Sequence, residues 1–132
     1  KLAILNFGAR LSETLKAAEN LLKKGVPITV VDARFAKPLD ENLIWQLATT
    51  HEAIMTIEEG SIGGFGSHVV NFLTKKGLMD SNLKFRSLTL PDIFIDQDTP
   101  DKMYKVANLD SVSIEEKVLD LLNSNIVLKK QN

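Results

Sequence analysis

Apolar residues are concentrated in four short runs along the chain, each as long as one β-strand. The runs lie at Leu2–Phe7, Ile28–Val31, Ala53–Ile57 and Phe85–Leu90. The segments between them carry apolar residues at every third or fourth position, which is the period of an amphipathic helix. Strands that alternate with helices favour a mostly parallel sheet with helices on both faces. The sequence therefore predicts one three-layer αβα domain over residues 1–123, followed by a partly frayed tail at 124–132.

The segment "ARLSETLKAAENLLKKG" predicts the first helix, which ends at Gly25. Its apolar residues fall at positions that share one side of a helix, and we expect this side to face the sheet. They are Leu11, Leu15, Ala18 and Leu22.

Later helices have recognisable start signals. Asp40 is expected to cap the helix that contains "ENLIWQLA", because an aspartate side chain can accept hydrogen bonds from the free N–H groups of a first turn. The segment "SHVVNFLTKK" predicts the next helix, with one apolar side. A last helix is expected from about Ser111, with Ser113 and Glu116 at the spacing of a capping box.

The composition narrows the kinds of site that the chain can hold. It has 132 residues, no cysteine and a formal net charge of −1. Without cysteine, thiol catalysis, cysteine-based zinc sites and disulfide bonds are excluded. The charge gives no electrostatic reason to expect nucleic acid or anionic lipid as a partner, and no apolar run approaches the ~20 residues of a membrane span. We expect a cytoplasmic protein with neither kind of partner.

A glycine-rich stretch, "EEGSIGGFGSHV" at 58–69, lies between the third strand and the following helix. Loops of this kind hold nucleotide phosphates in many α/β proteins. The glycine spacing matches neither the dinucleotide fingerprint nor the phosphate loop, and the carboxylates of Glu58 and Glu59 would repel a phosphate. Two interpretations stay open. One is a regulatory module that binds a nucleotide or phosphate through 60–67, and the other is a loop whose glycines permit positive φ and close approach to a neighbouring surface.

The other polar residues form no complete catalytic or metal-binding pattern. Glu58 and Glu59 are adjacent at a strand end, so their side chains point to opposite sides and are not expected to share a substrate. His51 and His68 have no partner at ligand spacing. Asp32 ends the second strand, where a dinucleotide fold places its ribose-binding acid, but the required glycines are missing. We predict no catalytic, cofactor-binding or metal-ligating residue in this chain.

Three stretches together resemble a known family. They are "DARFAKPLDENLI" at 32–44, "HEAIMTIEEGSIGGFGSHV" at 51–69 and "LPDIFIDQ" at 90–97. They are similar to the C-terminal domain of the 1-deoxy-D-xylulose-5-phosphate synthase family, which belongs to the transketolase superfamily. The Asp-x-Arg, Pro-Leu-Asp and Glu-Glu elements are shared across that superfamily, whereas "GSIGGFGSHV" and "LPDIFID" indicate the synthase. The resemblance covers nearly the whole chain.

The resemblance implies a fold and an assembly. The family's third domain has a mixed sheet of about five strands, one of them antiparallel, so a fifth strand is expected at 93–97 or within 109–132. That domain supports the subunit and its homodimer, and it has been suggested to bind regulators. The present chain begins with a strand and has no initiator methionine, which we interpret as a domain from a longer chain. Its expected partners are the two N-terminal domains of that chain and a second subunit.

The resemblance also implies an activity for the whole enzyme. The family condenses pyruvate with D-glyceraldehyde 3-phosphate, with decarboxylation, to 1-deoxy-D-xylulose 5-phosphate for isoprenoid, thiamine and pyridoxal synthesis. Its cofactors, thiamine diphosphate and Mg²⁺, are held by the two N-terminal domains, and the Gly-Asp-Gly…Asn motif that binds them is missing here. No catalytic residue of the family is therefore carried onto this chain, and the chain on its own is expected to be inactive.

In this light the polar and glycine-loop residues are candidates for organising the loops or for contacting a neighbouring domain or subunit. Arg34 is expected to pair with a carboxylate, either within the domain or on its neighbour, because a guanidinium can hold a carboxylate with two hydrogen bonds. Phe65 is a candidate apolar anchor on a neighbouring surface. The full set is Asp32, Arg34, Lys37, Glu58, Glu59, Gly60, Gly63, Gly64, Phe65, Gly66, His68, Asp92 and Phe94.

Overall fold

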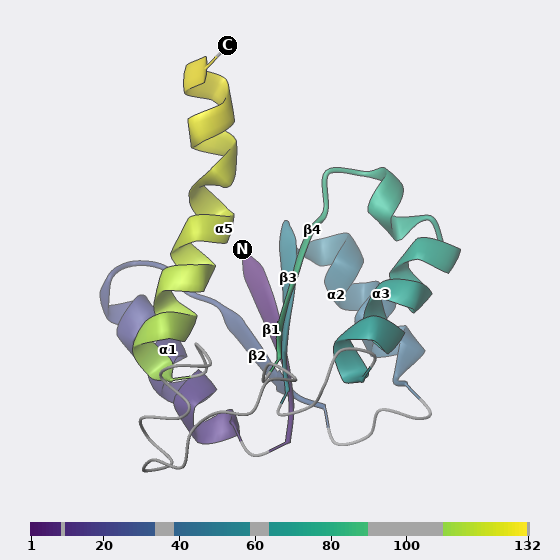
Figure 1. The fold of residues 1–132 in the computed structure, drawn as a ribbon, viewed down its shortest axis with the longest axis horizontal. Helices are drawn as coiled ribbons and strands as arrows, with labels where there is room; N and C mark the ends of the chain where they lie inside the picture. The colour runs from purple at the N-terminus through teal and green to yellow at the C-terminus, as the bar shows by residue number, and fades with distance from the viewer. Residues whose placement is uncertain (9, 34–38, 59–63, 90–109, 132) are drawn as a thin grey trace, which may run out of the picture.

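A computed structural model describes residues 1–8, 10–33, 39–58, 64–89 and 110–131, with side chains up to residue 123. Strands and helices alternate along the described chain (Figure 1). In order they are β1 (Leu2–Phe7), α1 (Leu11–Lys23), β2 (Thr29–Asp32), α2 (Glu41–Thr50), β3 (Ala53–Glu58), α3 (Phe65–Lys75), the 3₁₀ turn η1 (Leu78–Asp80), β4 (Lys84–Thr89) and α5 (Ser111–Gln131). The predicted α/β class is confirmed, and each predicted strand is present with its bounds shifted by a residue or so.

The described strands form one parallel sheet in the order β2-β1-β3-β4. The central strands β1 and β3 are buried almost throughout, whereas the edge strands are partly exposed. None of the described residues adds a fifth strand, and 111–131 is helical, so the antiparallel strand is not in that segment. The alternative position at 93–97 lies outside the described residues. The domain boundary at 123 stays a prediction, because α5 continues as a helix to Gln131.

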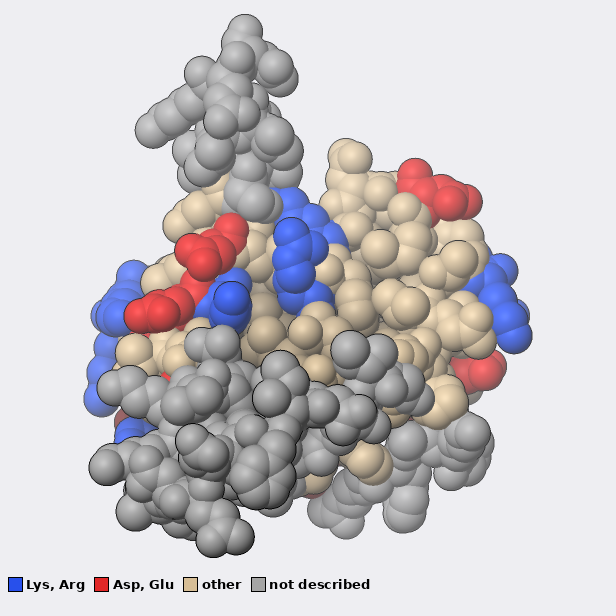
Figure 2. Space-filling model, in the orientation of Figure 1, with Lys and Arg blue, Asp and Glu red and all other residues tan. Residues whose placement is uncertain are grey.

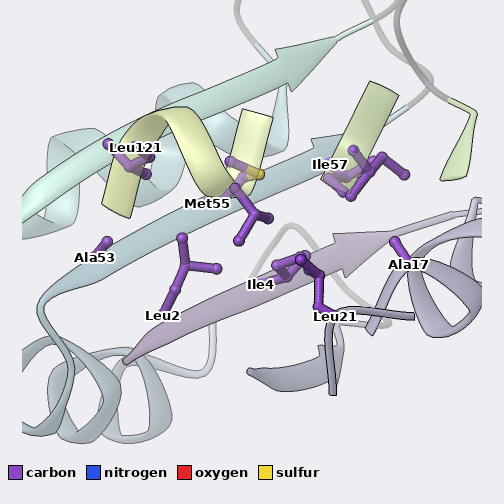
Figure 3. Close-up of a cluster of buried hydrophobic side chains, with 10 residues drawn as sticks. Leu2, Ile4, Ala17, Leu21, Ala53, Met55, Ile57 and Leu121 are labelled. Atoms are coloured by element: carbon purple, nitrogen blue, oxygen red, sulfur yellow. The ribbon is translucent and has the colours of Figure 1, made fainter. Parts of the chain in front are cut away.

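Helices cover the sheet on both faces, and each pair of helices closes its own apolar core. Helices α1 and α5 lie on one face, and α2 and α3 lie on the other (Figure 1). Alternate residues of β1 supply the two cores: Leu2 and Ile4 point towards α1 and α5, while Ala3 and Leu5 point towards α2 and α3. Figure 3 shows the first core, where side chains of β1 and β3 meet those of the two helices.

The side of α1 that faces the sheet differs from the one predicted. Leu15 is 50% exposed and Leu22 is 62% exposed, so the stripe of large apolar residues lies outward. The buried side carries Thr14, Ala17 and Leu21. A shift of one residue rotates a helix face by about 100°. The sequence misleads here because the inward side contains a threonine, whose hydroxyl donates a 2.8 Å hydrogen bond to Oδ1 of Asn6 in β1.

Aspartates begin two of the helices. Asp40 caps α2 as predicted, with Oδ1 accepting from the Leu43 N–H at 3.1 Å. In α5 the cap is Asp110, whose Oδ1 accepts from the Ser113 N–H at 3.0 Å. Ser113 therefore lies inside the helix, and the predicted capping box is wrong.

Polar contacts join α1 to α5 on the outside of their core. Oε2 of Glu13 accepts from the Ser111 N–H at 2.9 Å, and Glu115 pairs with Lys24 at 3.2 Å. Acidic and basic side chains are correspondingly seen next to each other over this part of the face in Figure 2. None of the described helices combines the length and apolarity needed to cross a membrane.

Opposite responses of two α1 positions test which side of this helix is buried. Ala17→Leu is expected to destabilise the domain by about 1–3 kcal/mol, because the added side chain has no room between helix and sheet. Leu15→Ala, on the exposed side, is expected to change the free energy of unfolding by less than about 0.5 kcal/mol. Urea denaturation of both variants measures this, and a larger loss for Leu15→Ala would place the predicted side inward after all.

Candidate functional site at the carboxyl ends of the central strands

The carboxyl ends of β1 and β3 form the natural place for a site in this sheet. The chain leaves β1 for α1 on one face and leaves β3 for α3 on the other face. In open α/β sheets, ligands bind in the crevice where successive connections diverge in this way. Phe7 and Glu58, the last residues of the two strands, are paired in register at this edge.

Glu58 is held at the start of α3. Its side chain is only 2% exposed, and Oε2 accepts from the Gly66 N–H at 3.1 Å. Gly66 is the second residue of α3, so its N–H is one of those left without a partner in the first helical turn. The carboxylate therefore occupies the position at a helix N-terminus that binds anions in other proteins.

Gly66 is required by the closeness of α3 to the sheet. A Cβ at this position would collide with Oγ of Ser87 and would lie 2.8 Å from Oγ1 of Thr56. Those two hydroxyls are themselves hydrogen-bonded across β3 and β4, with Thr56 donating to Ser87 at 3.1 Å. The described glycines with positive φ are Gly8, Gly25 and Gly77. At Gly66 the expected close approach is present, but it is made to the domain's own sheet and without positive φ.

Phe65 belongs to the core of this domain. Its side chain is 2% exposed and its ring stacks on that of Phe7, with the ring centroids 5.2 Å apart and the planes inclined by 15°. The expected anchor on a neighbouring surface is therefore wrong for this residue, because its ring is already covered. It fixes the start of α3 to the end of β1.

A second buried polar group lies at the end of β1. Asn6 is fully buried and accepts from the Thr14 hydroxyl at 2.8 Å, while its Nδ2 donates to the Gly8 carbonyl at 3.3 Å. The Asn6 carbonyl accepts from the Ala33 N–H at 2.8 Å, just beyond β2. One side chain and its peptide thus connect β1 to α1 and to the exit of β2.

Sequence comparison assigns a family to this arrangement. The family model described as "Transketolase, C-terminal domain" matches residues 1–114. The chain belongs to the transketolase C-terminal domain family. A solved structure described as "Split gene transketolase, inactive beta4 tetramer" has the same fold, with 27% sequence identity and a TM-score of 0.82. The match covers 93% of this chain but 39% of that one, so this transketolase C-terminal domain corresponds to a minor part of its relative.

The structure places only some of the predicted site residues of this transketolase C-terminal domain. It brings Glu58, Gly64, Phe65 and Gly66 together at the start of α3, where Gly64 is the N-cap. Asp32 is exposed at the end of β2, and His68 is half-buried in the first turns of α3. The remaining candidates lie outside the described residues: Arg34, Lys37, Glu59, Gly60, Gly63, Asp92 and Phe94.

Several residues of the site were not predicted. Asn6, Thr56 and Ser87 are polar residues inside runs that otherwise read as buried strands. A polar residue in a strand buried on both faces must find a hydrogen-bond partner, which is the signal that could have identified Asn6 and Thr56. Their partners on α1 and β4 could not be read from spacing, since they are distant in sequence.

The chemistry available to the described residues is limited. Among them, no group of three or more His, Asp or Glu side chains could hold a metal ion. The helix N-terminus that would attract a diphosphate is taken by Glu58, whose charge opposes a second anion. These residues therefore do not fit thiamine diphosphate with Mg²⁺, and the site described so far positions loops and helices.

Substitution of Gly66 tests the tight packing of α3. Gly66→Ala is expected to cost about 1–3 kcal/mol in the free energy of unfolding, because Ser87 must move and lose its bond from Thr56. Ser67→Ala, the adjacent and exposed position, serves as a control with a change below about 0.5 kcal/mol. Adding Ser87→Ala to Gly66→Ala should recover part of the loss, and a strictly additive double variant would contradict the proposed contact.

Proposed function

We propose that this chain is the C-terminal domain of a 1-deoxy-D-xylulose-5-phosphate synthase, a thiamine diphosphate-dependent transferase. The transketolase family match supports a parent of this superfamily. The choice of synthase within it is carried by "GSIGGFGSHV" and "LPDIFID", which indicate that enzyme by resemblance. In the parent, pyruvate and D-glyceraldehyde 3-phosphate are condensed with loss of carbon dioxide to 1-deoxy-D-xylulose 5-phosphate.

The proposed task of this domain is assembly and stability. By resemblance to the family, thiamine diphosphate and Mg²⁺ are assigned to the two N-terminal domains of the parent. In the described part of this chain, Glu58 already occupies the N-terminus of α3. Thiamine diphosphate supplies the carbanion chemistry when bound in the N-terminal domains. The buried contacts of Asn6 and Glu58 keep the edge of the sheet in a fixed shape against which other domains can pack.

Exposed apolar side chains support a role in assembly. Leu15 and Leu22 on α1 share one side of the helix and leave half or more of their side chains uncovered. Val112, in the first turn of α5, is 58% exposed. Burying side chains of this size is worth about 1.5–3 kcal/mol each. We propose that these side chains pack against the rest of a homodimeric enzyme, and the structural relative, a beta4 tetramer, is likewise an oligomer.

The regulatory alternative, a nucleotide or phosphate held by 60–67, has less support. Within that stretch, the described Gly66 has a backbone N–H at the start of α3 that a phosphate could use. This N–H already donates to Glu58. A phosphate at this N-terminus would have to displace a buried carboxylate and leave it without its hydrogen bond.

Activity assays of the full-length protein test the proposed reaction. Supplied with thiamine diphosphate, Mg²⁺, pyruvate and D-glyceraldehyde 3-phosphate, it should release carbon dioxide and form 1-deoxy-D-xylulose 5-phosphate. Ketol transfer from a sugar phosphate without carbon dioxide release would instead indicate a transketolase.

Calorimetry of the 132-residue chain with thiamine diphosphate and Mg²⁺ should give no binding heat, and saturable binding would contradict the assignment of the cofactor to other domains.

Two substitutions in the full-length protein test the assembly role. Leu22→Asp should weaken subunit or domain association measured by analytical ultracentrifugation, while the isolated chain with the same change keeps its stability within about 0.5 kcal/mol.

Arg34→Ala should weaken association more than it slows turnover in intact protein. A normal dimer whose kcat falls by about a thousandfold, or ~4 kcal/mol in the barrier, would show that Arg34 acts in chemistry instead.

A further inference from the structure

Half of the Glu58 carboxylate has no hydrogen-bond partner among the residues that the structure describes. Oε2 is bound by the Gly66 N–H, whereas Oε1 is buried and accepts no hydrogen bond from any described residue. A buried carboxylate oxygen without a donor is costly, and native proteins rarely leave one unmatched. The arrangement therefore calls for a donor that the described chain does not supply.

A hollow lined in part by Glu58 offers room for such a donor. It measures about 340 Å³ and lies between the first turns of α3 and strand β4. Its walls are Glu58, Gly66, Ser67, Val70, Phe85, Ser87 and Thr89. Among these described residues Glu58 carries the one charge, the hydroxyls of Ser67, Ser87 and Thr89 supply neutral polar groups, and Val70 and Phe85 supply apolar surface.

The charges at the hollow select a cation over an anion. A helix N-terminus carries an effective charge of roughly +0.5, and the carboxylate contributes −1 when ionised, so the combination stays negative. The described walls hold no lysine or arginine that could reverse this sign. Phosphate and other anions are thus disfavoured, although the glycine loop and hydroxyls look suited to them. A cationic N–H group fits the hollow, because it supplies a positive charge opposite the carboxylate and a hydrogen-bond donor for Oε1.

We propose that the hollow beside Glu58 binds a guanidinium or primary ammonium group, which donates to Oε1 while the Gly66 N–H continues to donate to Oε2. The flat guanidinium also fits the apolar walls, because it is less strongly hydrated than an ammonium ion. A free amine and an Arg or Lys side chain of a protein partner both present this chemistry. The proposal is independent of the reaction assigned to the parent enzyme.

Titration of the 132-residue chain with guanidinium chloride at non-denaturing, millimolar concentration tests the proposal, with sodium chloride at equal ionic strength as the reference. The amide resonances of Gly66 and Ser87 are followed by NMR. We expect saturable shifts with guanidinium and with methylammonium, and none with sodium chloride or inorganic phosphate. Saturable binding of phosphate at these resonances, or their indifference to both cations, would overturn the proposal.

Matched variants identify the carboxylate as the receptor. Glu58→Gln keeps an oxygen for the Gly66 N–H but removes the charge, and should weaken guanidinium binding by about tenfold or more. Glu52→Gln removes the same charge from an exposed residue just before β3 and should leave binding unchanged. If Glu58→Gln does not fold, Val70→Phe, which fills the hollow, provides the second test. Unaltered affinity in a folded Glu58→Gln or Val70→Phe variant would refute the site.

The same titration on the full-length protein separates the two sources of the cation. If a protein side chain is the natural occupant, assembly should exclude guanidinium from the hollow and the shifts should disappear. If a free amine is the natural ligand, the shifts should persist with unchanged affinity. If calorimetry shows that guanidinium binds both the 132-residue chain and the full-length protein, and Glu58→Gln does not weaken this binding, the proposal is contradicted for either source of the cation.

Discussion

Each central strand of the sheet carries a buried polar side chain, at its last residue in β3 and one residue earlier in β1, that is bound by the first turns of the next helix. Asn6 of β1 accepts from Thr14 of α1 on one face, and Glu58 of β3 accepts from the Gly66 N–H of α3 on the other. Both polar groups lie where burial without a partner would cost on the order of 1–3 kcal/mol. These two contacts hold the first turns of α1 and α3 against the strands that precede them, and the apolar cores hold the rest of each helix.

This constraint argues against a phosphate at the start of α3, which is the described part of the glycine-rich stretch. In nucleotide-binding α/β proteins, glycine lets a helix N-terminus approach a ligand anion, and the ligand supplies the negative charge. Here Gly66 lets the helix approach Ser87 and Thr56, and Glu58 supplies the charge from within the chain. A helix N-terminus still meets a negative charge here, but the charge belongs to a side chain of the same chain, and the contact stabilises the domain. A glycine beside a helix N-terminus in this fold therefore has a structural reason that needs no ligand.

The sequence predicted what depends on local pattern and missed what depends on contacts between distant segments. Strand positions, the Asp40 cap and the α/β class follow from periodicity and helix-start chemistry, and all are present. The inward face of α1 could not be read in this way, because it carries Thr14, whose buried hydroxyl finds its partner, Asn6, only in the folded sheet. The partners of Glu58 and Gly66 were equally out of reach, since Ser87 comes from another strand.

The exposed leucines of α1 show a general limit of predicting buried helix faces from periodicity. A regular stripe of leucines shows that one side of a helix is apolar, but it does not say whether the domain's own sheet or another protein surface will cover it. In this domain the sheet is covered by the other side of α1, which carries the small residue Ala17 and permits close packing. Leu15 and Leu22 stay exposed, and in the proposed assembly they would contribute hydrophobic area to association. In that proposal, one side of α1 stabilises the domain and the opposite side stabilises the assembly.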